Sequence, residues 1–211
     1  MSLKEQLLTQ LLSLQDIDAW QPYETKFFGS SVRSLSFFGD VSKERAQTFI
    51  SQLLHLCEED EEEPITVWLN TSGGSLTDGL AIYDTIKNIS CPVLIYTTGL
   101  CASAGLIILC AGDYRIATES TVFYYHQPVM DDTSINSSKD MDELQKFYNF
   151  SREKMDGIIK QKTKLRKATW NKYFEGKTSY YFSSKDALKF KLIDKIAESN
   201  KLEFELQEEG E

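Results

Sequence analysis

A strand–helix–strand pattern in the first half of the chain limits its fold more than any other feature. Residues 65–69 (Ile-Thr-Val-Trp-Leu) form a short apolar run that is typical of a buried strand, and residues 93–98 form a second one. Between them, apolar residues recur at helical spacing over residues 75–88. A strand, a helix and a strand at this spacing are typical of a parallel crossover unit. The sequence therefore predicts an α/β fold.

The rest of the pattern predicts one core domain with appendages. The 211 residues divide into an N-terminal helix and arm (1–31), a head domain (32–130), a long helical segment (131–163), a return to the head domain (164–197) and an acidic tail (198–211). Within the return, residues 192–196 are predicted to form a closing strand.

The long helical segment carries an apolar stripe. Its members recur at alternating spacings of three and four, with Ser151 in the one gap: Met141, Leu144, Tyr148, Met155 and Ile158. A helix of about 25 residues spans nearly 40 Å, which is longer than a compact domain of this size needs. We therefore expect this helix to project and to meet a partner. The alternative is a helix packed on its own domain.

Composition excludes several classes of function. Hydrophobic residues make up 41% of the chain and charged residues 26%, as in globular proteins. The sequence has no apolar run of membrane-spanning length and no pattern of a secretory signal. A net charge of −9 argues against nucleic acid as a partner. The four cysteines lack metal-ligand spacing and predict reduced core thiols, hence a cytoplasmic location, with the plastid stroma as the alternative.

Two segments carry residues suited to nucleophilic chemistry. Ser103 lies in a turn of small residues, Gly99–Gly105, that opens a helical segment, and His126 follows in a second apolar segment. A serine hydroxyl becomes a good nucleophile when a nearby base takes its proton. Upstream, Gly73-Gly74 stands between a predicted strand and a helix, where backbone N–H groups can bind a developing negative charge.

These segments resemble the proteolytic subunit of the ATP-dependent Clp protease. The matching motifs are Asn70-Thr71-Ser72-Gly73-Gly74, Gly99-Leu100-Cys101-Ala102-Ser103-Ala104-Gly105 and Tyr124-Tyr125-His126-Gln127-Pro128. Their order and spacing match the family from about Ser34 to Ile196. The resemblance implies the Clp peptidase and crotonase-like spiral of strand–strand–helix units, with the long helix as a projecting handle. It also implies subunits that stack as two heptameric rings around a chamber.

The resemblance assigns roles to particular residues. Ser103 is the expected nucleophile, His126 the base, and the backbone N–H groups of Gly74 and Ala104 the oxyanion hole. The family's third catalytic residue is an aspartate four positions before the serine that opens the next helix, and Ser179 occupies that position here. Three alternatives follow: Ser179 or Thr178 orients His126, Glu175 does so, or the subunit is weak or inactive.

The resulting prediction is a serine endopeptidase that degrades peptides and unfolded polypeptides, with a separate ATPase unfoldase as a possible partner. No cofactor and no metal is expected. Gly176-Lys177-Thr178 ends like a phosphate-binding loop, but Asn171 replaces the glycine that such a loop requires, which argues against nucleotide binding. The first alternative is a non-catalytic subunit of a mixed ring. The second is a crotonase-like enzyme of acyl-CoA thioesters, against which the Ser103 and His126 motifs argue.

Overall fold

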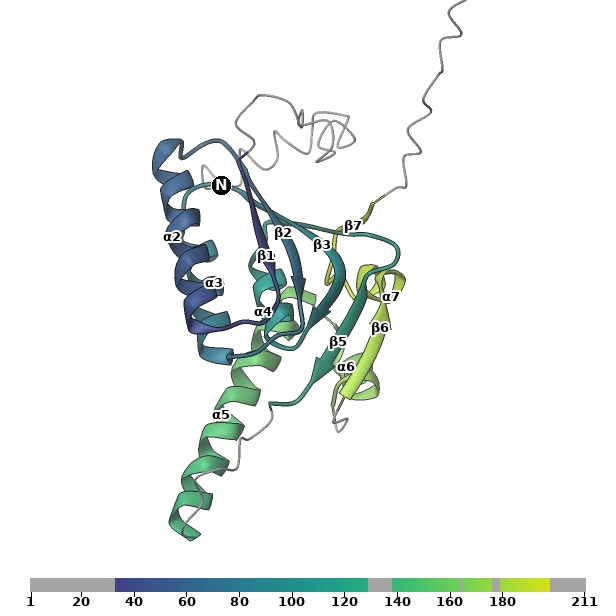
Figure 1. Cartoon of the computed structure of the whole chain (residues 1–211). Helices are drawn as coiled ribbons and strands as arrows, with labels where there is room; N and C mark the ends of the chain where they lie inside the picture. The colour runs from purple at the N-terminus through teal and green to yellow at the C-terminus, as the bar shows by residue number, and fades with distance from the viewer. Residues whose placement is uncertain (1–32, 129–137, 164, 176–178, 198–211) are drawn as a thin grey trace, which may run out of the picture.

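The computed structural model describes residues 33–128, 138–163, 165–175 and 179–197 (Figure 1). The predicted N-terminal helix and arm, the acidic tail and the segment Gly176–Thr178 lie outside the described residues.

Most of the described strands form one parallel sheet. The strands are β1 (Ser34–Phe38), β2 (Ile65–Thr71), β3 (Val93–Ala102), β4 (Tyr114–Ala117), β5 (Val122–His126), β6 (Ser179–Ser183) and β7 (Lys195–Ile196). Within the described residues, five of them lie in the order β1-β2-β3-β4-β7, and each neighbouring pair is parallel. This arrangement confirms the predicted α/β class.

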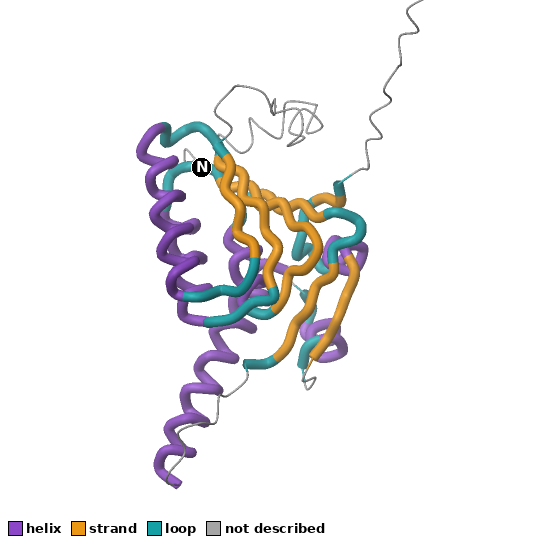
Figure 2. The backbone as a smooth tube through the Cα atoms, viewed as in Figure 1, coloured by secondary structure: helices purple, strands orange, loops and turns teal. Residues whose placement is uncertain are grey.

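The helices connect these strands and cover the sheet. They are α2 (Lys43–Glu59), α3 (Leu76–Asn88), α4 (Ala104–Ala111), α5 (Ser138–Thr163), α6 (Lys167–Tyr173) and α7 (Ser184–Lys189). Helices α2 and α3 run along one face of β1–β3 (Figure 2). Every residue of α4 is buried, as expected for a helix that is apolar on all sides. Burial of each leucine or isoleucine there contributes about 1.5–3 kcal/mol.

Strand β3 bends and changes partner along its length. Its first half pairs with β4, and after Gly99 residues Leu100–Ala102 pair with β5 instead. Gly99 has φ +62°, a conformation that glycine adopts without steric cost. The sequence pattern predicted a strand only to residue 98, and the bend explains why the apolar run ends before the strand does. The bend brings β5 beside the chain that leads into Ser103.

Strand β6 pairs with β5 in the antiparallel direction. The register places Ser179 directly opposite His126 and Tyr181 opposite Tyr124. Residues directly opposite in an antiparallel pair project to the same face of the sheet. The position of the family's aspartate is thus a cross-strand neighbour of the predicted base.

The prediction of a strand over residues 192–196 was wrong for its first half. Only Lys195 and Ile196 form β7. The backbone N–H groups of Leu192 and Ile193 both donate to the carbonyl of Ala187, at 2.9 and 3.4 Å, and so terminate α7. Their side chains are buried, which accounts for an apolar run that resembles a strand.

The long helix α5 has two different halves. From Lys139 to Phe150 no side chain is buried, and Figure 1 shows this half extending beyond the sheet. The second half packs against α4 and buries Met155 and Ile159. Among the described residues, no helix is both long enough and apolar enough to cross a membrane.

Candidate active site

Ser103 lies in a sharp turn between β3 and α4. Its backbone has φ 54° and ψ −121°, a conformation that costs a residue with a side chain about 1–3 kcal/mol. The N–H of Ser103 donates to the carbonyl of Tyr124 at 2.8 Å, which ties the turn to β5. Its side chain makes no capping hydrogen bond to α4, although it stands at the N-cap position. The hydroxyl is therefore not committed to helix capping.

His126 ends β5, the strand that pairs with the end of β3. Ala102, the last residue of β3, lies opposite Tyr124 in the parallel neighbour β5. Ser103, which follows β3, and His126, which ends β5, therefore lie at the same end of two adjacent strands. The imidazole stacks on the ring of Tyr124, with centroids 5.2 Å apart, and its Nδ1 lies 2.6 Å from the carbonyl oxygen of Gln127. The ring is thus held on one face and at one nitrogen.

A cavity of about 380 Å³ joins these residues. It is lined by Ser72, Gly74, Ser75, Leu76, Thr77, Ser103, Ala104, His126, Pro128, Phe147, Ser151 and Met155. The predicted nucleophile, base and both oxyanion-hole residues therefore share one cavity. Its volume lies within the usual range of ligand-binding cavities, about 300–1,000 Å³.

Gly74 and Ala104 reach the cavity from two different elements. Gly74 forms an isolated parallel bridge with Val41, whose N–H donates to the carbonyl of Gly73 at 2.8 Å. Ala104 is the first residue of α4, where backbone N–H groups have no partner within the helix. The arrangement suits binding of an anionic oxygen, because the positive end of the α4 dipole also points there.

The third catalytic position holds no carboxylate. Ser179 faces His126 across the strand pair, yet in the described part of the chain the two side chains form no hydrogen bond, and Nδ1 contacts Gln127 instead. Thr178 lies outside the described residues.

Glu175 is engaged away from His126. Its Oε1 accepts from the Arg152 guanidinium at 3.2 Å, and its Oε2 accepts from the Trp170 indole at 3.0 Å. It lines a different cavity, together with Arg152 and Asp156. This arrangement does not support the alternative in which Glu175 orients the base.

Sequence reasoning missed the contribution of α5 to the cavity. Phe147, Ser151 and Met155 line it, although the stripe on this helix was expected to meet a partner or the body of the domain. Ser151 is 3% exposed. The signal in the sequence was that single polar residue within an apolar stripe.

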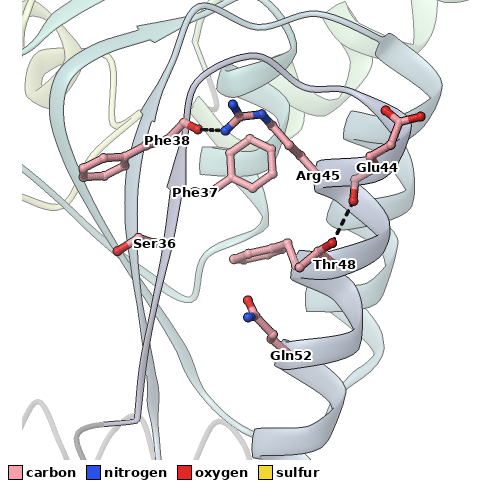
Figure 3. Close-up of a pocket in the computed structure, with 8 residues that line it drawn as sticks. Ser36, Phe37, Phe38, Glu44, Arg45, Thr48 and Gln52 are labelled. Atoms are coloured by element: carbon pink, nitrogen blue, oxygen red, sulfur yellow. Dashed lines mark hydrogen bonds between the residues drawn. The ribbon is translucent and has the colours of Figure 1, made fainter.

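Another depression, of about 280 Å³, lies between β1 and α2 (Figure 3). Phe37, Phe38 and Phe49 form its apolar wall, and Arg45 donates from its guanidinium to the carbonyl of Phe38. The hydroxyl of Thr48 donates a hydrogen bond to the carbonyl of Glu44, one turn earlier in α2. This depression shares no lining residue with the cavity at Ser103, to which the predicted chemistry belongs.

The site combines a serine on a strained strand-to-helix turn, a histidine in the same cavity and backbone N–H groups at a glycine-rich turn. These features together define a serine hydrolase type of site on an α/β fold. Comparison with known families narrows the class: the Clp protease family model matches residues 26–200. The chain belongs to the Clp protease family.

Similar proteins agree with this assignment. The ATP-dependent Clp protease proteolytic subunit 3 of Synechococcus sp. (strain CC9902) is 32% identical over 175 residues, covering 78% of this chain and 82% of the relative. Proteolytic subunit 1 of Chlamydia felis is 31% identical over 195 residues, covering 85% and 94%. Among solved structures, a mutant of ClpP1 from Listeria monocytogenes has a TM-score of 0.70 and 26% identity, over 80% of this chain and 93% of that one.

Proposed function

We propose that this chain is a serine endopeptidase that cleaves peptides and unfolded polypeptides, with Ser103 as the nucleophile and His126 as the general base. The observation that carries the proposal is the shared cavity of Ser103, Ala104, Gly74 and His126. Membership of the Clp protease family supports the same reaction.

The mechanism follows from the placement of these groups. A substrate carbonyl enters the cavity, and Ser103 Oγ attacks its carbon while the imidazole of His126 takes the hydroxyl proton. The oxyanion that forms accepts hydrogen bonds from the N–H groups of Gly74 and Ala104. His126 then gives its proton to the leaving amine, and water hydrolyses the acyl-enzyme by the same route.

The second candidate is a non-catalytic subunit of a mixed ring. It is favoured by one observation: a serine, and not a carboxylate, faces His126 at position 179. An aspartate partner stabilises the imidazolium that forms during attack, and its loss in a well-studied triad costs about 10⁴ in turnover. Activity in this chain is therefore expected to be lower than in a complete triad.

The proposed assembly is a stack of two heptameric rings. The half of α5 from Lys139 to Phe150, called the free half below, carries exposed apolar side chains at Met141, Phe147 and Phe150. Exposed apolar patches mark surfaces at which proteins interact. The same helix of a second subunit is proposed to pack against these side chains. Family membership supports a chamber of this kind, fed by a separate ATPase unfoldase.

Hydrolysis of a short fluorogenic peptide tests the function, because such a substrate needs no unfolding. Wild type is expected to release fluorophore at a rate that Ser103→Ala abolishes. Ser51→Ala, which removes an exposed hydroxyl on α2, is the matched control and keeps the wild-type rate. Absence of turnover in wild type would favour the non-catalytic subunit. Equal turnover in wild type and Ser103→Ala would refute the nucleophile.

A further inference from the structure

The hydrogen bond at Nδ1 of His126 fixes where its proton lies. The carbonyl oxygen of Gln127, 2.6 Å away, can only accept, so Nδ1 must donate. In the neutral ring this leaves Nε2 without a proton. A nitrogen in that state is what a base needs to take the proton of a serine hydroxyl. In complete triads an aspartate selects the same tautomer.

No carboxylate competes for this role in the described structure. The described residues that line the Ser103 cavity include no aspartate and no glutamate. Glu175 is bound to Arg152 and Trp170, and Ser179 makes no hydrogen bond to the ring within the described residues. Nδ1 donates its hydrogen bond to the carbonyl of Gln127.

Both chain neighbours of His126 are hydrogen-bonded to α5. The hydroxyl of Tyr148 donates to Oε1 of Gln127 at 2.6 Å. Two turns further along α5, Asp156 accepts from the hydroxyl of Tyr125, also at 2.6 Å. Burial raises the pKa of Tyr125, so that its phenol keeps the proton it donates. The residues on either side of the base are therefore fixed to one helix.

We propose that the main-chain carbonyl of Gln127 takes the place of the missing aspartate, and that Tyr148 is a positioning residue which holds this carbonyl through the Gln127 side chain. The inference rests on the proposed function. It explains how a chain with Ser179 at the third position can keep its base in the productive tautomer. A carbonyl dipole stabilises an imidazolium less than a carboxylate does, which agrees with the lower activity expected above.

The first test is removal of the Tyr148 hydroxyl. Tyr148→Phe keeps the ring on α5 and deletes the hydrogen bond to Gln127. We expect kcat for the fluorogenic peptide to fall about fivefold with KM unchanged, the effect of losing one neutral hydrogen bond. Tyr173→Phe is the matched control, because Tyr173 lies on α6 among Tyr180 and Phe190, away from the cavity. A kcat for Tyr148→Phe equal to that of the control would overturn the role of Tyr148.

The second test reads the tautomer directly and does not depend on activity. The chain has two histidines, so a solid-state ¹⁵N spectrum of histidine-labelled protein contains two imidazoles, and His55→Gln assigns them. We expect neutral His126 to carry its proton on Nδ1 in wild type, with part of that population moved to Nε2 in Tyr148→Phe. A wild-type proton on Nε2 would overturn the inference. Failure of the proposed function would instead appear as absent peptide turnover in wild type.

The third test is rescue by a carboxylate. Ser179→Asp supplies an acid opposite His126, so Nδ1 no longer depends on the carbonyl. In that background Tyr148→Phe should lower kcat by less than twofold. A full fivefold loss there would mean that Tyr148 acts on something other than Nδ1.

Discussion

A β-carbon added to Gly73 would lie 2.6 Å from the β-carbon of Ser103 and 2.7 Å from the carbonyl oxygen of Ala102. The glycine-rich turn after β2 therefore touches the turn that presents the predicted nucleophile. Gly73 also has φ +87°, which disfavours any residue with a side chain. The two motifs, 30 positions apart in the sequence, form one surface.

Gly73→Ala should lower peptide turnover by at least about 100-fold, because the new methyl group must displace Ser103 or the backbone at Ala102, and a shift of about 1 Å costs that much. Steady-state hydrolysis measures the effect. Gly157→Ala, in α5, is the matched control, because within the described residues nothing packs within 4 Å of the added β-carbon. This substitution should stabilise the helix by up to about 1 kcal/mol. Wild-type turnover in Gly73→Ala would contradict the contact.

Ser179→Asp should raise peptide turnover about tenfold. The register places position 179 opposite His126, and a carboxylate there would stabilise the imidazolium. The gain is expected to be far below 10⁴ because the surrounding residues do not hold the new group in place. Ser179→Ala serves as the control and should leave turnover near wild type. A loss of activity in Ser179→Asp alone would show that position 179 does not serve the base.

Asp194→Asn should destabilise the fold by about 3–5 kcal/mol. The carboxylate of Asp194 accepts from Nε and Nη2 of Arg115 at 2.8 and 2.7 Å, and the Arg115 side chain is 5% exposed. Removing one partner leaves the buried guanidinium without its counter-charge. Urea unfolding measures the change. Glu119→Gln breaks the exposed pair with Lys185 and should change stability by less than about 1 kcal/mol.

Replacing Met141 and Phe150 with aspartate should reduce the mass of the assembled particle. Both side chains are at least half exposed on the free half of α5, where the proposed second copy packs. Light scattering should give a large multiple of the 24.1 kDa chain for wild type and a smaller one for the variant. Lys146→Asp, on the same half of the helix, should keep the wild-type mass. A wild-type monomer would rule out the ring.

Local patterns predicted much of this fold. Apolar spacing located β2, α3 and the first part of β3, because hydrophobic periodicity follows directly from burial on one face. The small-residue turn around Ser103 was also readable, since few residue types fit a sharp strand-to-helix turn. The long helical segment was predicted over 131–163, and the observed helix α5 lies within it at Ser138–Thr163.

What could not be predicted depends on contacts between distant segments. The partner of His126 Nδ1 is a main-chain carbonyl, and every residue type carries one, so no motif marks it. The hydrogen bond from Tyr148 joins α5 to the end of β5, and its existence depends on how α5 packs. The pairing of Glu175 with Arg152 also depends on how α5 packs, and the position of Glu175 four residues before Ser179 gave no sign of it.

If His126 activates Ser103 as a nucleophile, a fluorophosphonate should modify the protein at that serine, and the intact mass of the treated protein measures this. We expect one adduct per chain, located on Ser103 by peptide mapping, with no adduct on Ser103→Ala and much slower labelling of His126→Ala. An unmodified wild-type protein, or an adduct on any other residue, would contradict it.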